Sequence, residues 1–134
     1  MKAQNVPHFI LIDDLPMNNM LCSLYILKIF PKADIQTFTD PREGLEYIRT
    51  KNTGTGVHET IVFLDLKMPM LTGWDVLEKI AGFPGDAITG FKIYILTSST
   101  NSRDKERAEG NPLVTGYIEK PVTDIELRVL FPNA

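Results

Sequence analysis

Five short apolar runs, separated by helix-like segments, constrain the fold more than any other feature of this sequence. The runs are HFILID (8–13), DIQTF (34–38), IVFLD (61–65), KIYILT (92–97) and VTGYIEK (114–120). The first run lacks polar alternation, which is typical of a strand buried on both faces. Strands that alternate with helices indicate parallel βαβ units, because parallel neighbours need a crossover connection. We therefore predict an α/β fold with one parallel sheet and helices on both of its faces.

The segments between the runs carry helix start and stop signals. Asp40 and Pro41 are typical of an N-cap and a first helical position, and Gly110 is typical of a helix end. The expected helices cover residues 15–30, 41–51, 74–81, 102–110 and 123–131. The chain of 134 residues is long enough for one domain, and we expect residues 1–134 to form it around a core of about 8–131.

Composition excludes several classes of function. The formal net charge of −3 leaves no basic footprint for nucleic acid. The single cysteine, Cys22, excludes an internal disulfide framework and is expected to be a small buried residue. No apolar run reaches the roughly 18 to 20 residues that cross a membrane, and the N-terminus does not resemble a secretory signal. We expect a cytoplasmic protein.

Chemically active side chains stand where the apolar runs end. Asp13 and Asp14 close the first run, Asp65 the third, Thr97 the fourth and Lys120 the fifth. In a parallel sheet with helices on both faces, ligands bind at the carboxyl ends of the strands. Each residue alone has a simpler explanation, since an aspartate often caps a helix and a lysine is often a solvated charge. Taken together, these five residues predict a ligand-binding or catalytic site at the carboxyl edge of the sheet.

Three clustered carboxylates would repel one another and raise one another's pKa, and a bound cation removes that difficulty. Carboxylate oxygens suit Mg²⁺, whereas His8, His58 and Cys22 show no spacing typical of a transition-metal site. A carboxylate beside Mg²⁺, a lysine and a hydroxyl group also meets the needs of phosphoryl transfer, in which an aspartate can itself be the nucleophile. These arguments leave the source of the phosphoryl group open.

Four segments together resemble the response-regulator receiver domain of two-component signalling, over about residues 8–131. They are ILIDD (10–14), FLDLKMPMLTGWDVL (63–77), YILTSS (94–99) and GYIEKP (116–121). The resemblance implies a flavodoxin-like doubly wound sheet of five parallel strands in the order 2-1-3-4-5. It also implies a signalling protein that takes part in its own phosphorylation and dephosphorylation, and not an enzyme.

The resemblance implies a role for each residue of the metal site. Asp65 is expected to be the phosphoacceptor, Asp14 a direct Mg²⁺ ligand, and Asp13 a neighbour that acts largely through water and the lysine. Lys67 would offer its backbone carbonyl to the metal, while its side chain is expected to reach into water. The resemblance also implies that position 99, a serine here, flanks the pocket together with position 67, and that the two would tune the lifetime of the aspartyl phosphate.

The remaining residues implied by the resemblance serve the phosphoryl group and the switch. Thr97 would hydrogen-bond the phosphoryl group, Lys120 would contact its oxygens, and the Lys120–Pro121 peptide would be cis. Tyr117 stands at the aromatic switch position, although a strand tyrosine that simply packs on a helix is an equally good expectation for the resting state. Trp74 is expected to pack.

The function expected from these residues is a phosphorylation-dependent switch. A histidine kinase or phosphotransfer protein would donate to Asp65, and a surface around the fourth and fifth strands would then bind an unknown protein target. We expect a monomer or weak homodimer without nucleic-acid or membrane partners. The alternatives are a receiver module of a longer regulator cut at Ala134, an intermediate in a phosphorelay, a small-substrate Mg²⁺ phosphatase, and an unphosphorylated interaction module. The phosphatase is disfavoured because Leu66 and Lys67, not a second acid, follow Asp65.

Overall fold

The computed structural model describes residues 6–50, 59–84, 90–98, 102–132 and 134. Strands and helices alternate along the chain as the apolar runs predict. The elements are β1 (His8–Ile12), α1 (Pro16–Ile29), β2 (Asp34–Phe38), α2 (Pro41–Thr50), β3 (Thr60–Asp65), α3 (Gly73–Ala81), β4 (Phe91–Thr97), α4 (Ser102–Glu109), β5 (Val114–Glu119) and α5 (Asp124–Leu130). Each predicted end lies within one residue of the observed end.

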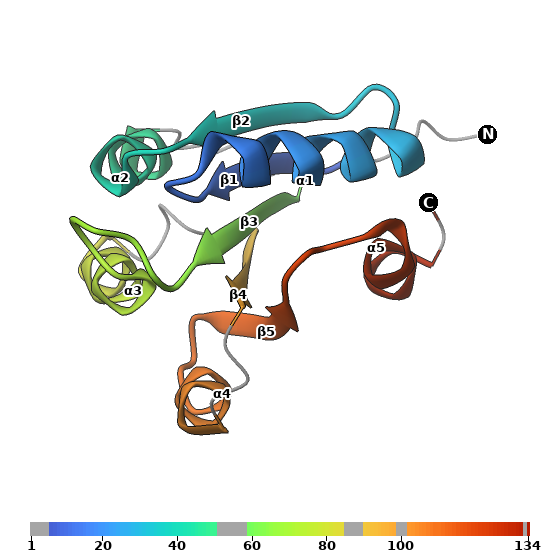
Figure 1. Ribbon diagram of the computed structural model, residues 1–134. Coiled ribbons are helices and arrows are strands. Elements are labelled where there is room, and N and C mark those ends of the chain that lie inside the picture. The colour runs from blue at the N-terminus through green and yellow to red at the C-terminus, as the bar shows by residue number, and fades with distance from the viewer. Residues whose placement is uncertain (1–5, 51–58, 85–89, 99–101, 133) are drawn as a thin grey trace.

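The five strands form one parallel sheet in the order β2-β1-β3-β4-β5, which confirms the predicted topology (Figure 1). The register places Ile12 of β1 beside Leu64 of β3, so the residues that follow these two strands emerge next to each other. The order reverses between β1 and β3, and it is at such a reversal that ligands bind in sheets of this type.

Helices cover both faces of the sheet, α1 and α5 on one and α2, α3 and α4 on the other (Figure 1). β1 is completely buried because its alternate side chains enter different cores. Phe9 and Leu11 pack under α1 and α5, whereas Ile10 and Ile12 pack under α2 and α3. Burying each such side chain contributes about 1.5–3 kcal/mol, so an uninterrupted apolar run is what this position in the sheet requires.

Helix α1 is apolar on two sides. Asn19, Cys22 and Ile26 are buried against the sheet, and the burial of Cys22 is as predicted. The opposite side carries exposed apolar side chains, 37% to 60% exposed, at Met17, Met20, Leu21, Leu24 and Leu27. The segment was correctly predicted as a helix, but most of its leucines lie on the solvent side.

Helix α4 is weakly attached to the rest of the domain. Ala108 is its only buried side chain among the described residues of the helix. The Arg107 guanidinium carbon lies 4.3 Å from the ring centroid of Trp74 on α3, so Trp74 packs, as expected, under a cation. The helix ends as predicted, with the Gly110 N–H donating to the Glu106 carbonyl at 3.0 Å.

Within the described ranges, no helix is long and apolar enough to cross a membrane.

Candidate functional site

Three aspartates gather at the carboxyl edge of β1 and β3. One carboxylate oxygen of each of Asp13, Asp14 and Asp65 lies within 4.8 Å of the other two. The parallel register of the two strands brings the residue after Ile12 beside the end of β3. Asp13 and Asp65 are buried, and Asp14 is half-buried. The convergence predicted from the strand ends is therefore present in the fold.

Lys120 bridges two of these carboxylates. Its Nζ lies 2.9 Å from Asp13 Oδ2 and 3.0 Å from Asp65 Oδ1. The lysine is held in place by its backbone N–H, which donates to the Thr97 carbonyl at 2.8 Å. The Lys120–Pro121 peptide is cis, as the sequence resemblance implied. Asp14 makes no ion pair with any of the described residues.

Two asparagines on α1 hold the acidic loop, and the sequence analysis did not identify either of them. The Asn18 amide donates to both oxygens of Asp13, at 3.3 and 3.2 Å, and the Leu15 N–H donates to Asp13 Oδ1 at 3.0 Å. The buried Asn19 amide donates to the backbone carbonyls of Asp13 at 3.1 Å and Phe38 at 3.3 Å. Both oxygens of Asp13 thus have protein donors, including Lys120.

The charges of the site influence one another. Burial raises the pKa of the Asp65 carboxyl above its usual value; the Lys120 hydrogen bond opposes this, and the Asp13 charge adds to it. Burial lowers the pKa of the Lys120 ammonium, but its hydrogen bonds to Asp13 and Asp65 outweigh this effect and leave the pKa raised. The site therefore holds a protonated lysine beside an aspartate whose pKa is raised by its burial.

Thr97 and Tyr117 lie on neighbouring strands near this edge. Thr97 is buried at the end of β4, and Tyr117 is half-buried on β5 and packs against the core on the face that α2, α3 and α4 cover. Burial raises the pKa of the Tyr117 phenol, the Asp104 charge adds to it, and a hydrogen bond with the Thr97 side chain opposes it. The two residues that the sequence analysis assigned to switching are thus directly linked.

The loop between β3 and α3 packs closely against the backbone of Asp65. The side chain of Lys67 is exposed, in agreement with the expectation that it reaches into water. Gly73 is closely packed, because a Cβ atom there would lie 2.7 Å from the Asp65 carbonyl oxygen and 3.0 Å from Leu66 Cα. Ser99 and His58, both considered in the sequence analysis, lie outside the described residues.

Comparison with known proteins assigns the family. The family model of the response regulator receiver domain matches residues 9–131, so this chain belongs to that family. A curated relative, the probable methanogenesis regulatory protein FilR2 of Methanothrix harundinacea, is 26% identical over 96% of this chain and 81% of its own length. The stress response regulator protein 1 of Clavispora lusitaniae is 31% identical over 57% of this chain, and the match covers only 38% of that relative's length.

Solved structures agree with the fold. The crystal structure of a two-component response regulator from Cytophaga hutchinsonii has a TM-score of 0.84, with 24% identity, and the match covers 96% of each chain. A response regulator receiver protein from Dyadobacter fermentans has a TM-score of 0.83, with 24% identity, over 93% of this chain and 94% of that one. At these identities the likeness concerns the fold.

The donor set fits the cation that receiver domains generally bind at their acidic pocket. Mg²⁺ is held by oxygen ligands at about 2.0–2.1 Å in an octahedron, so ligands on opposite sides lie roughly 4.2 Å apart. The three carboxylate oxygens, all within 4.8 Å of one another, need only small adjustments to reach this spacing. Both oxygens of Asp13 already accept protein hydrogen bonds, and Oδ1 of Asp65 is paired with Lys120.

Proposed function

We propose that this protein is a phosphorylation-dependent switch in which Asp65 accepts a phosphoryl group from a phosphohistidine. A carboxylate oxygen of Asp65 attacks the phosphorus, the phosphorus–nitrogen bond to the donor's imidazole breaks, and an aspartyl phosphate forms. The neutral imidazole leaves with the electron pair of the broken bond. The donor is a histidine kinase or a phosphotransfer protein.

The observation that supports this proposal most directly is the Lys120 bridge. The ammonium group lies 3.0 Å from Asp65 and 2.9 Å from Asp13, at the place where the oxygens of a phosphoryl group on Asp65 would carry negative charge. Phosphoryl transfer depends on such positioned positive charge more than on covalent chemistry by the protein. A surface ion pair would serve no such purpose.

Mg²⁺ would be held by the carboxylates of Asp14 and Asp65 and the backbone carbonyl of Lys67, with Asp13 acting through water. When bound, the cation supplies the positive charge that the three carboxylates and the incoming phosphoryl group together require. Asn18 and Lys120 keep the Asp13 carboxylate oriented toward that position.

Signal output involves Thr97 and Tyr117. In the phosphorylated protein, Thr97 donates its hydroxyl to a phosphoryl oxygen, and Tyr117 follows because the two side chains are hydrogen-bonded. These residues lie on β4 and β5, so the change reaches the adjacent α4, which has a single buried side chain. Phosphorylation in this way shifts the population between two arrangements of one surface, and a protein target binds one of them.

The donor docks on the exposed apolar side of α1. Met17, Met20, Leu24 and Leu27 follow one another at intervals of three and four residues, which forms a stripe suited to another helix. The stripe begins at Met17, four residues after Asp13 in the sequence, so a helix that lies on it would bring a histidine close to Asp65. Leu24→Asp should abolish transfer from a protein donor but leave labelling by acetyl phosphate unchanged.

Labelling by acetyl phosphate with Mg²⁺, followed by intact-mass spectrometry, tests the chemistry. Wild type should gain one phosphoryl group, and both Asp65→Asn and the addition of EDTA should prevent this. Labelling that persists in Asp65→Asn would contradict the proposed acceptor. Phosphotransfer profiling against candidate kinases then identifies the donor, and onward transfer to a second histidine protein would distinguish a phosphorelay intermediate from a terminal switch.

A further inference from the structure

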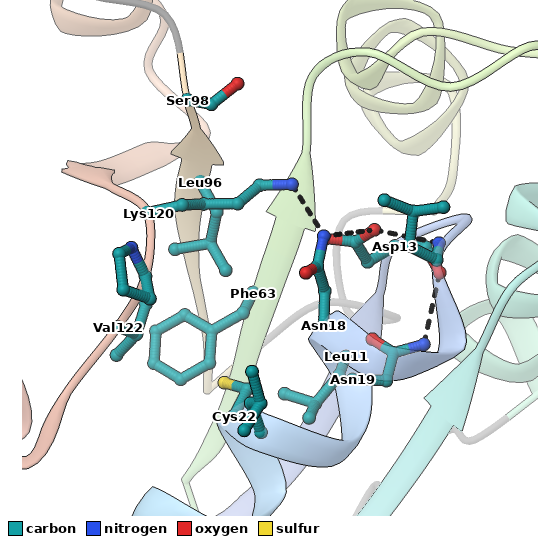
Figure 2. Close-up of a pocket in the computed structure, with 13 residues that line it drawn as sticks. Leu11, Asp13, Asn18, Asn19, Cys22, Phe63, Leu96, Ser98, Lys120 and Val122 are labelled. Atoms are coloured by element: carbon teal, nitrogen blue, oxygen red, sulfur yellow. Dashed lines mark hydrogen bonds and ion pairs between the residues drawn. The ribbon is translucent and has the colours of Figure 1, made fainter.

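A cavity of about 350 Å³ lies between α1, the sheet and the loop after β5, next to the phosphoacceptor site. Leu11, Phe63 and Leu96 from three neighbouring strands form its floor, and Cys22 and Val122 form its walls. Figure 2 shows these side chains gathered around the Cys22 thiol, with Asp13, Asn18 and Lys120 at one end. All five apolar side chains are at most 8% exposed, whereas Leu15 and Leu21, which also line the space, are 54% and 41% exposed, so the cavity has a buried apolar floor and opens to solvent on the side of these two leucines.

The sequence of α1 explains why this space exists. Protein interiors are normally close-packed, and voids larger than a water molecule are few. The residues that α1 turns toward the sheet in its first two turns are two asparagines, which are tied to the acidic loop, and the small Cys22. One turn later Ile26 is fully buried and fills the corresponding space. The cavity is therefore a property of this stretch of α1.

Shape and charge define what the cavity accepts. An apolar cavity of about 150 Å³ is enough to bind benzene in another protein, so 350 Å³ has room for a two-ring molecule. Burial raises the pKa of the Cys22 thiol to about 12, and the Asp13 charge adds to this effect, so the thiol that forms part of the cavity wall remains uncharged. At the polar end three carboxylates face a single ammonium, which disfavours an anion when Mg²⁺ is absent, and Asn18 offers a side-chain oxygen as an acceptor.

We propose that this cavity is a binding site for a small uncharged molecule with an aromatic or branched apolar body and one hydrogen-bond donor. The apolar body lies on Phe63 and Leu96 beside Cys22, and the donor group points toward Asn18 at the polar end. Nothing in the phosphotransfer chemistry requires such a site, so it is a ligand site in addition to the phosphoacceptor.

Occupancy of the cavity would regulate phosphotransfer, and this consequence rests on the proposed function. The exposed side chains of Leu15 and Leu21 line the entrance, and Leu21 adjoins the stripe on α1 where the donor protein docks. A bound molecule changes how these two side chains pack, and it also lies beside Lys120. It therefore competes with a protein donor more strongly than with acetyl phosphate, which needs no docking surface.

Indole serves as the probe because it is uncharged, bicyclic and carries one N–H donor. Titration into the isotope-labelled protein, without any phosphoryl donor, should shift the methyl resonances of Leu11, Leu96 and Val122 in a saturable way. Indole-3-acetate has the same rings and a negative charge, and it should bind about tenfold more weakly, a difference of about 1.4 kcal/mol. Because no phosphoryl donor is present, the result is independent of whether Asp65 is the acceptor.

Substitutions that fill the cavity provide the second arm. Cys22→Leu adds apolar atoms inside it and should weaken indole binding about tenfold while raising the thermal unfolding midpoint, because the added atoms occupy empty space. Val122→Ile reaches in from the opposite wall and should weaken binding as well. Val129→Leu, at a position on α5 that is 75% exposed, enlarges a side chain elsewhere and should change neither quantity.

Three results would overturn the proposal: methyl shifts that do not saturate or do not map to the cavity, unchanged indole affinity in both filling variants, or tighter binding of indole-3-acetate than of indole. If Cys22→Leu does not fold, Val122→Ile decides the question. Failure of acetyl phosphate to label Asp65, with indole binding intact, would contradict the proposed function and leave the ligand site standing.

Discussion

Replacing Lys120 by methionine tests the electrostatic account of the site. Methionine keeps most of the side-chain volume and removes the charge, so Asp13 and Asp65 are left buried beside each other without the ammonium. In the absence of Mg²⁺ the variant should be less stable than wild type. The same substitution at Lys28, which is 59% exposed and lies 4.0 Å from Asp124, should cost less than about 0.5 kcal/mol.

The expected magnitude follows from the two contact distances. At about 3 Å and an effective dielectric constant of about 20, each contact is worth roughly 5 kcal/mol of Coulomb energy. Desolvation of the three groups offsets most of this, and removing one partner of a buried pair typically costs about 3–5 kcal/mol. Because the Lys120 side chain is still 18% exposed, we expect the lower end, about 3 kcal/mol, which lowers the unfolding midpoint of a chain of this size by about 10 °C.

Chemical denaturation in EDTA and in excess Mg²⁺ measures both parts of the argument. A cation that binds only the folded protein, at about 100 times its Kd, stabilises it by about 2.7 kcal/mol. Mg²⁺ should therefore restore most of the stability lost in Lys120→Met, because it would neutralise Asp65 directly and Asp13 through a bound water, the two carboxylates that lose the ammonium. The double variant with Asp13→Asn should lose less than the sum of the single losses.

Two results would refute this reasoning. If Lys120→Met were as stable as wild type in EDTA, the bridge would make no net contribution to folding. If the variant were destabilised but Mg²⁺ restored nothing, the loss would come from altered packing around the side chain and not from the unpaired carboxylates.

Other predictions concern the surroundings of the site. Because burial raises the pKa of Asp65, the stability that its protonated form contributes is present below about pH 4 and is lost as the pH rises through the folded-state pKa. In urea unfolding with EDTA, the free energy of unfolding should therefore fall less steeply with rising pH for Asp65→Asn than for wild type. Equal slopes for the two proteins would contradict this. Asn19→Ala should cost about 1–3 kcal/mol in the same assay, because two backbone carbonyls lose a buried donor, and Asn19→Asp should not restore it. Gly73→Ala should destabilise by about 1–3 kcal/mol and slow labelling, because its Cβ meets backbone at 2.7 Å; normal labelling kinetics would argue against this contact. The fluorescence of Trp74, the only tryptophan, should change with beryllofluoride and Mg²⁺, and Arg107→Gln should reduce the change because the guanidinium lies over the ring.

The fold and the charged part of the site could be predicted because they depend on features local in sequence. Apolar runs such as residues 8–13 and 61–65 mark buried strands, and the first polar residues after them mark the edge where ligands bind. Asp13, Asp65 and Lys120 were found in this way. The roles that bring Tyr117 and Lys67 into the site came from the family resemblance, since nothing in their spacing indicates them.

The parts that were missed depend on how elements meet in space. The Asn18 and Asn19 contacts arise from the rotation of α1 relative to the loop that precedes it, and spacing along the helix does not reveal which side faces the sheet. The same rotation leaves Leu24 exposed and turns Cys22 toward the cavity. The stacking of Arg107 on Trp74 joins two helices that no sequence signal pairs.

The weak attachment of α4 has a consequence for the resting protein. Burial of Ala108 contributes about 0.8 kcal/mol, and an exposed cation–π contact such as that of Arg107 with Trp74 about 0.5–1 kcal/mol. These two contacts together contribute roughly 1.5 kcal/mol, so losing them would change an equilibrium between two positions of α4 by about a factor of ten, because each 1.4 kcal/mol is a factor of ten. We therefore expect the unstimulated protein to be a mixture of two arrangements, so that a signal has only to change their proportions.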